Sequence, residues 1–108
     1  MPTNPFISGR VNLYSMALQA RASHILVKTE EEANKIMKRL ADGEEFDKVA
    51  RRFSSCPSGK NGGDLGWFGK GQMVPEFEKV AFENDAGKVV GPVKTQFGYH
   101  VIKVTGRK

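Results

Sequence analysis

The sequence predicts an α+β fold in which helices cover a small, mainly antiparallel sheet. Three observations support this class: an apolar β-branched segment followed by two amphipathic ones, a third helical segment that begins at a proline, and two adjacent strand-like segments near the end. With 108 residues, 39% of them hydrophobic and 27% charged, the chain suits one soluble globular domain with a modest core. No internal repeat is visible.

The first half of the fold is predicted to be a strand and two helices. Residues 22–28, ASHILVK, are apolar and β-branched and form the strand. Residues 29–43 form a helix, which Thr29 and Glu32 begin with a capping box and Gly43 ends. In the next helix the apolar residues recur at i, i+3, i+4 and i+7: Phe46, Val49, Ala50 and Phe53. Two such helices in succession should cover one face of the sheet.

The second half begins with the glycine-rich segment 54–73, in which LGWF at 65–68 is the best candidate for a short strand. Pro75 suits the first turn of a third helix, PEFEKVAFE. Two closing strands follow, KVVGPVKT and GYHVIKV, joined through Gln96 and Phe97. The order of elements is therefore strand, two helices, strand, helix, strand, strand.

Residues 1–20 are predicted to be a flexible N-terminal tail or leader, and residues 21–108 the folded domain. The first segment has no helical or strand period, and prolines and a glycine interrupt it. It lacks the continuous apolar core of a secretory signal. Because no acidic residue precedes Glu30, an organellar transit segment stays open as an alternative to a cytoplasmic protein, and Met16 could mark a native start behind an added leader.

Composition limits the partners and cofactors. No run approaches the roughly 20 apolar residues of a membrane span. The 17 basic and 12 acidic residues give a net charge of +5, but the basic residues are dispersed along the chain. A nucleic-acid partner, which needs clustered charge, is therefore an open but less favoured alternative. The single cysteine excludes an internal disulfide and suits a reducing compartment, and with two histidines it cannot repeat a zinc-ligand pattern. We expect no metal and no cofactor.

Both histidines lie in predicted strands, His24 in SHIL and His100 in YHVI. If these strands are neighbours, the two rings can meet. Side chains alternate along a strand, so if Ile25 faces the helices, His24 faces the opposite side, where the glycine-rich segment must fold back. We expect His24, His100 and Cys56 to gather around one cavity. The alternative is that these residues have only a structural role, with both histidines hydrogen-bonded in the core and Cys56 a structural cysteine.

Other chemistries fit the glycine-rich segment poorly. Cys56 is followed by Pro57, which removes a backbone donor, and no catalytic-cysteine signature surrounds it, so a thiol hydrolase is disfavoured. GKNGGDLGWFGKG matches neither phosphate-binding glycine pattern. Met73 and Phe77 stand four residues apart and can share a face. With Leu65 and Phe97 they would form an apolar slot, unless all of these residues are simply core.

Three stretches of the sequence together resemble the parvulin family of peptidyl-prolyl cis–trans isomerases: SHILVK, FDKVARRFSSCPSGKNGGDLGWFGKGQMVPEFEKVAF and GPVKTQFGYHVIKV. The likeness runs from about Arg21 to Val104, and in its lack of appended modules the chain looks most like the small stand-alone parvulins of prokaryotes. It implies a four-stranded antiparallel sheet wrapped by about four helices, with the active site on the open face of the sheet. It also implies that no cofactor is needed.

The resemblance assigns roles by position. His24 and His100 match the paired histidines of the family, Cys56 matches a position held by Cys or Asp, and Thr95 matches the hydroxyl residue beside the histidine pair. Leu65, Met73 and Phe77 match the pocket for the proline ring, and Phe97 would add a wall. The expected substrates are proline-containing peptides and unfolded or nascent proteins. Alternatives from the residues are a proline-motif binding or chaperone module, and a basic nucleic-acid-associated protein.

One departure from the family concerns phosphate. Phosphate-directed parvulins carry a longer basic loop after the first strand, whereas here Lys28 runs directly into Thr29 and three glutamates, Glu30–Glu32. A phosphoserine before proline would meet carboxylates instead of arginines, which is a repulsive arrangement. The sequence therefore predicts an isomerase that does not require phosphate. We also expect the protein to be a monomer.

Overall fold

The computed structural model describes residues 18–108, and in this part of the chain four strands form one antiparallel sheet in the order β2-β1-β4-β3. The elements follow as β1 (Gln19–Val27), α2 (Glu30–Ala41), α3 (Phe46–Phe53), the 3-10 helix η1 (Pro57–Asn61), β2 (Asp64–Gly69), α4 (Pro75–Glu83), β3 (Val89–Thr95) and β4 (Gly98–Arg107). The predicted fold class is confirmed, with three α-helices and one 3-10 helix among the described residues.

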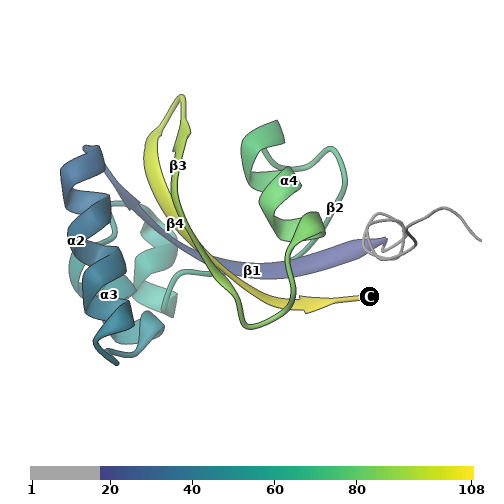
Figure 1. Cartoon of the computed structure of the whole chain (residues 1–108). Helices are drawn as coiled ribbons and strands as arrows, with labels where there is room; N and C mark the ends of the chain where they lie inside the picture. The colour runs from purple at the N-terminus through teal and green to yellow at the C-terminus, as the bar shows by residue number, and fades with distance from the viewer. Residues whose placement is uncertain (1–17) are drawn as a thin grey trace, which may run out of the picture.

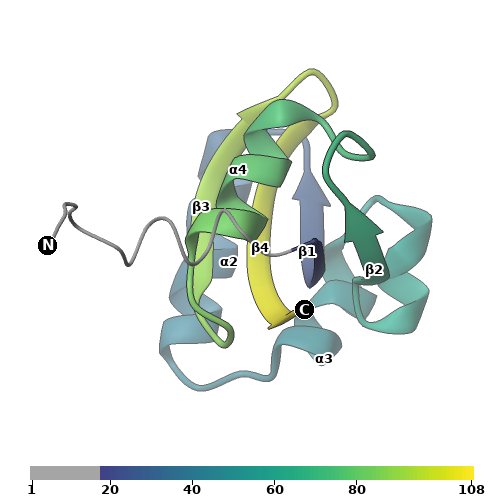
Figure 2. The same ribbon diagram turned by 90° about the vertical axis from the view of Figure 1, so that its right-hand side faces the viewer.

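Helices cover both faces of the sheet. Figure 1 shows α2 and α3 on one side and α4 on the other, and Figure 2 shows the four strands side by side with α4 in front. The alternation predicted for β1 explains this arrangement, because Ile25 and Val27 are buried with α2 and α3, while Ala20 and Ala22 are buried with α4. The two helices that follow β1 therefore cover one face, as predicted.

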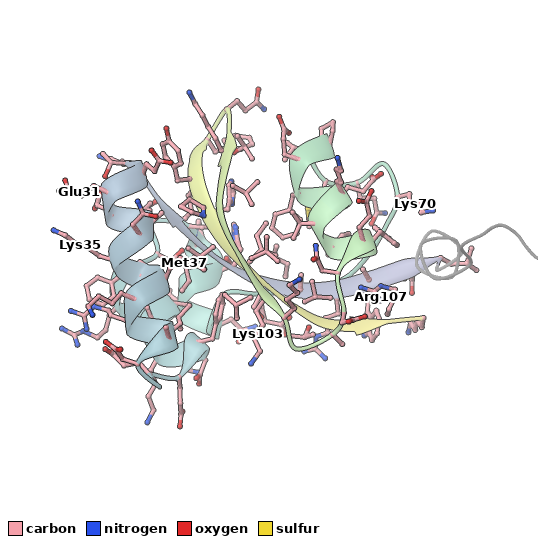
Figure 3. The ribbon with its side chains drawn as sticks, viewed as in Figure 1. Glu31, Lys35, Met37, Lys70, Lys103 and Arg107 are labelled. Carbon is pink, nitrogen blue, oxygen red and sulfur yellow. The ribbon has the colours of Figure 1, made fainter. Side chains whose placement is uncertain are left out.

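The start of α2 is a capping box, as the sequence indicates. The Thr29 hydroxyl oxygen accepts a hydrogen bond from the Glu32 N–H at 3.1 Å and donates one to the Glu32 carboxylate at 3.1 Å. Three glutamates in the first turn and Lys38 and Arg39 in the last suit the helix dipole. Glu31 and Lys35 point away from the sheet, as Figure 3 shows.

The glycine-rich segment folds back against β1 through η1. The His24 N–H donates to the Gly63 carbonyl at 2.9 Å, which fixes the chain beside the middle of the strand. Gly63 has a φ of 84°, and a Cβ there would clash with the His24 carbonyl oxygen. Only glycine allows this close approach, so it brings Cys56 and its neighbours next to β1.

The sheet is longer than the sequence pattern indicates. β1 starts at Gln19 and β4 continues to Arg107, because Gln19 and Lys108 exchange two backbone hydrogen bonds of 2.8 and 2.9 Å. The sheet thus begins before the predicted boundary at residue 21, and residues 1–17 of the tail predicted for residues 1–20 lie outside the described residues. None of the described helices has the length and apolar character needed to cross a membrane.

Candidate active site

An apolar pocket of about 540 Å³ opens on the α4 face of the sheet. It lies between α4, the segments on either side of β2, and the turn that joins β3 to β4. Its lining comprises His24, Leu26, Ser55, Cys56, Pro57, Leu65, Gln72, Met73, Val74, Phe77, Phe97 and His100. Seven of the eight site residues predicted from the sequence line this one pocket, and the eighth, Thr95, lies directly behind His100.

The two histidines meet because β1 and β4 are neighbours. Leu26 pairs with His100 and His24 with Ile102, so the two rings lie diagonally across the strand pair. Their Nδ1 atoms are 2.9 Å apart, and the rings stack with centroids 5.1 Å apart at an angle of 19°. The predicted contact between the histidines, 76 residues apart in the chain, is present.

A chain of hydrogen bonds extends the histidine pair in both directions. Thr95 Oγ1 lies 2.8 Å from His100 Nε2, His24 Nε2 lies 3.2 Å from Ser58 Oγ, and the Ser58 hydroxyl donates to Cys56 Sγ at 3.3 Å. The Ser58 hydroxyl donates its hydrogen bond to Cys56, so its oxygen accepts one from His24 Nε2–H. His24 Nδ1 then carries no hydrogen and accepts a hydrogen bond from His100 Nδ1–H. Thr95 then donates to His100 Nε2. Every link is satisfied with both rings neutral.

Burial favours the neutral form of both rings. Burial and, to a smaller extent, the neighbouring His100 together lower the pKa of His24 to about 4. Burial also lowers the pKa of His100, against an opposing effect of the Glu76 carboxylate, which raises it. Near neutral pH the pocket therefore has a floor of uncharged, hydrogen-bonded imidazoles.

Phe77 joins this floor to the core. Its ring packs edge-on against the rings of His24 and His100, with distances between ring centroids of 5.7 and 6.0 Å. It also packs edge-on against the core ring of Phe68, with a centroid distance of 5.8 Å. Phe77 is only 2% exposed, whereas Phe97 at the rim is 62% exposed. Leu65 and Met73 are partly buried beside Phe77 and complete the apolar wall. The slot predicted from four apolar residues therefore forms, with Phe77 at its base.

The surroundings of Cys56 differ from those of a nucleophile. Cys56 is partly buried, and its sulfur accepts a hydrogen bond from a serine hydroxyl, which in turn contacts His24. A thiol hydrolase would need a base in direct contact with the thiol and a third group to orient that base. The arrangement suits a polar contact to a substrate better than covalent attack. The described residues also hold no cluster of three or more metal-ligating side chains.

Ser58 is a residue of this site that the sequence analysis did not single out. It connects His24 to Cys56, so the chain of hydrogen bonds depends on it. A serine in a glycine-rich segment without periodicity gives no local signal, and only the fold of η1 places its hydroxyl between the two residues. Among the glycine-rich segment's large side chains, Phe68 is core, as expected, and Trp67 is 41% exposed and does not line the pocket.

Residues 18–106 match the family model "Rotamase: PPIC-type PPIASE domain". The chain is 54% identical over 89 residues to the foldase protein PrsA of Geobacillus kaustophilus, covering 82% of this chain and 32% of that protein. It is 51% identical over 86 residues to PrsA of Bacillus subtilis, covering 79% of this chain and 30% of that protein. The chain thus spans about a third of the length of these curated relatives.

Two solved structures resemble the fold closely. The peptidylprolyl isomerase PrsA from Bacillus anthracis superposes with a TM-score of 0.83 at 44% identity, over 85% of this chain and 43% of that one. NmPin, the parvulin of Nitrosopumilus maritimus, gives a TM-score of 0.75 at 45% identity, over 83% of this chain and 98% of that one. The second match shows that nearly all of a solved parvulin corresponds to this fold.

Proposed function

The chain belongs to the PPIC-type peptidyl-prolyl isomerase family, the parvulins, and we propose that it accelerates cis–trans interconversion of Xaa-Pro bonds in peptides and unfolded proteins. The observation that carries the proposal is the apolar pocket beside a neutral, fully hydrogen-bonded histidine pair. The relatives named as foldases support unfolded chains as substrates.

The reaction makes no chemical bond and breaks none. Rotation about an amide bond has a barrier of roughly 18–20 kcal/mol, because it destroys amide resonance, and uncatalysed Xaa-Pro bonds exchange over tens to hundreds of seconds. A catalyst must bind the twisted amide better than either planar form. About 1.4 kcal/mol of such preference gives a tenfold acceleration, so modest contacts suffice.

In this mechanism the apolar wall holds the proline ring. Leu65, Met73 and Phe77 enclose the ring and exclude water from the amide. Without water, the carbonyl loses hydrogen bonds that favour its planar, polarised form, and rotation becomes easier. Phe97 lies at the rim and covers the ring from the solvent side.

The polar chain acts on the bond that rotates. The Cys56 sulfur accepts a hydrogen bond from the Ser58 hydroxyl, so its own S–H can turn toward the substrate amide. The histidines and Thr95 keep the floor of the pocket rigid and neutral. In this proposal Cys56 tunes the polarity near the carbonyl and forms no covalent intermediate.

We also propose that a phosphate before proline is not required. The first turn of α2, which only Lys28 and Thr29 separate from the end of β1, carries the three exposed carboxylates Glu30–Glu32, as the sequence indicates. We expect Ser-Pro peptides to turn over readily and their phosphoserine counterparts to gain less than about tenfold, since exposed charges act weakly. A much larger gain on phosphorylation would overturn this part of the proposal.

The compartment and assembly state are part of the same proposal. A single, partly buried cysteine suits a monomer in a reducing compartment such as the cytoplasm, with an organelle as the alternative. Size-exclusion chromatography with light scattering tests the monomer. Fractionation of the native cells tests the location, and recovery outside the cytoplasm would refute it.

The decisive experiment is exchange NMR on unphosphorylated Ala-Xaa-Pro-Phe peptides with and without the protein. We expect faster cis–trans exchange that Phe77→Ala abolishes. Because Phe77 is also core, Met73→Ala serves as a second variant that removes pocket wall from a partly buried position. Peptide shifts without faster exchange would instead indicate a proline-motif binding or chaperone module, an alternative that the exposed Phe97 favours.

A further inference from the structure

The proline pocket adjoins two smaller hollows of opposite charge, which share lining residues with it but none with each other. Resting on the proposed isomerase function, we propose that this groove selects substrates by charge on either side of proline. An acidic side chain before proline is preferred at one end, and a basic side chain after proline at the other. The recognised class is thus a dipolar segment of an unfolded chain.

The cationic end is a hollow of about 320 Å³ between α3 and η1. It shares Ser55, Cys56 and Pro57 with the proline pocket, so a peptide crossing Cys56 passes from one to the other. Its charged residues are Arg51 and Lys60, and no carboxylate is among the described residues that line it. An anionic side chain would find two cations here.

The two cations are available to a ligand to different degrees. Lys60 is exposed and forms no ion pair with any described residue. Arg51 contacts Asp47 one helical turn away at 3.6 Å, in a pair whose side chains are about half exposed. Such surface pairs are weak, so Arg51 can turn toward a ligand at little cost. The hydroxyls of Ser54 and Ser55 are already bound to the backbone of Leu26, so charge dominates this hollow.

The second hollow beside the proline pocket carries a carboxylate. A hollow of about 210 Å³, lined by Val74, Pro75, Glu76 and Gln96, shares Val74 with the proline pocket. Glu76 is exposed and has no ion pair among the described residues, and its charge reaches far enough to act on His100. The first turn of α4 also contains Glu78, so carboxylates outweigh the partial positive charge of the helix end.

The polar chain fixes the direction of the peptide. Cys56 lines both the proline pocket and the cationic hollow, and the Ser58 hydroxyl donates a hydrogen bond to its sulfur. The bond that rotates joins the proline nitrogen to the preceding carbonyl, and the proposed mechanism places this bond over Cys56. The residue before proline therefore points toward Arg51 and Lys60 and not toward Glu30–Glu32, none of which lines the proline pocket or the cationic hollow. The residues after proline run toward Glu76.

Two capped peptides with the same composition test the proposal, one containing Glu-Pro-Phe-Lys and the other Lys-Pro-Phe-Glu. Their equal net charge cancels any general attraction to a protein of charge +5. We measure the exchange rate and, by shift titration of the same samples, the Kd. In 20 mM salt we expect the Glu-first peptide to bind about fivefold more tightly and to exchange about fivefold faster than the other peptide. In 1 M salt both ratios should fall toward one, because salt screens the charges. Equal or reversed preference at low salt would overturn the proposal.

Charge-reversal variants locate the effect. We expect Lys60→Glu combined with Glu76→Lys to reverse the preference, since both side chains are exposed and their exchange leaves the core untouched. Lys35→Glu is the matched control, because Lys35 projects from the outer side of α2, across the sheet from α4 (Figure 3). If the double reversal leaves the preference unchanged, or if Lys35→Glu removes it, the charge selection does not arise at Lys60 and Glu76.

The two readouts separate this proposal from the isomerase function. If both peptides are accelerated equally and bind equally, the isomerase function stands and the charge selection fails. If neither is accelerated but the Glu-first peptide binds more tightly, the charge selection stands and the isomerase function fails.

Discussion

The two faces of the sheet are built from different side chains. On the α2/α3 face, β1 and β4 contribute Ile25, Val27 and Val101 to a core that two helices close. On the α4 face a single nine-residue helix covers the sheet, and the core there is dominated by the rings of Phe68, Phe77 and Phe82. Among the residues that the structure describes, three of the four buried polar side chains, His24, Thr95 and His100, belong to the pocket side.

This contrast shows how one small sheet serves two purposes. The first face is filled with apolar side chains and stabilises the fold. On the second face the helix stops short of full cover, so the edge of the core becomes a pocket with a polar floor. Substitutions on the first face should change stability alone, whereas those on the second should change stability and activity together.

The largest expected effect compares Phe77→Ala with Ile25→Ala. Both side chains are almost fully buried, so we expect each variant to lose stability, by about 3–5 kcal/mol for Phe77 and about 2–5 kcal/mol for Ile25. Only Phe77→Ala should abolish peptide exchange in the molecules that stay folded. Urea unfolding and exchange NMR measure the two quantities. Full activity per folded molecule in Phe77→Ala would remove the distinction between the faces.

A glycine pair tests how the pocket side is held together. Gly63 and Gly43 both have positive φ, 84° and 104°, but only Gly63 is crowded, against His24. We expect Gly43→Ala to cost about 1 kcal/mol and Gly63→Ala about 3 kcal/mol, since the second adds a steric clash to backbone strain. Thermal unfolding measures both. Equal losses would show that η1 is not anchored by this contact.

The pH dependence of stability should come from the pocket side. His24 has a pKa of about 4 in the folded state, below the value of about 6.5 of an unfolded histidine. Between these values the unfolded state binds more protons, so stability falls as the pH drops from 6.5 to 4, by on the order of 2 kcal/mol. Above pH 6.5 the stability is fully present. His100, whose pKa is also lowered by burial, acts in the same direction.

Urea unfolding at several pH values measures this loss, with one variant from each face. His24→Gln should flatten the pH dependence between 6.5 and 4.5. Val49→Ala, on the α2/α3 face, should lower stability equally at every pH in that range. An unchanged slope in His24→Gln would assign the pH dependence to other groups.

The smallest expected effect belongs to Cys56→Ser. A serine hydroxyl can still accept from Ser58 and donate to the substrate, so we expect activity to fall less than about tenfold, or about 1.4 kcal/mol, with little change in stability. Exchange NMR measures the rate, and mass spectrometry checks for adducts. Loss of all activity together with a trapped thioester would show that Cys56 is a nucleophile.

Much of this architecture can be predicted because local patterns agree with it. The alternation around Ile25 and the capping box at Thr29 specify β1 and α2, and the same alternation places His24 opposite the helices. What the pattern does not encode is pairing at a distance. The added length of β1 and β4 depends on contacts between Gln19 and Lys108, and the role of Ser58 depends on how η1 folds back. Neither leaves a local periodic signal.

The directed chain from Thr95 to Cys56 has a consequence for coordination chemistry. A neutral imidazole has one nitrogen lone pair that can bind a metal, and in each of the two rings this lone pair already accepts a hydrogen bond. His24 Nδ1 accepts from His100, and His100 Nε2 accepts from Thr95. A transition-metal ion could ligate either ring only by displacing a hydrogen bond, which at His24 is the side-chain contact between β1 and β4 at the floor of the pocket. Two adjacent histidines and a thiol resemble a ligand set, but here hydrogen bonds compete with zinc or nickel for the nitrogen lone pairs.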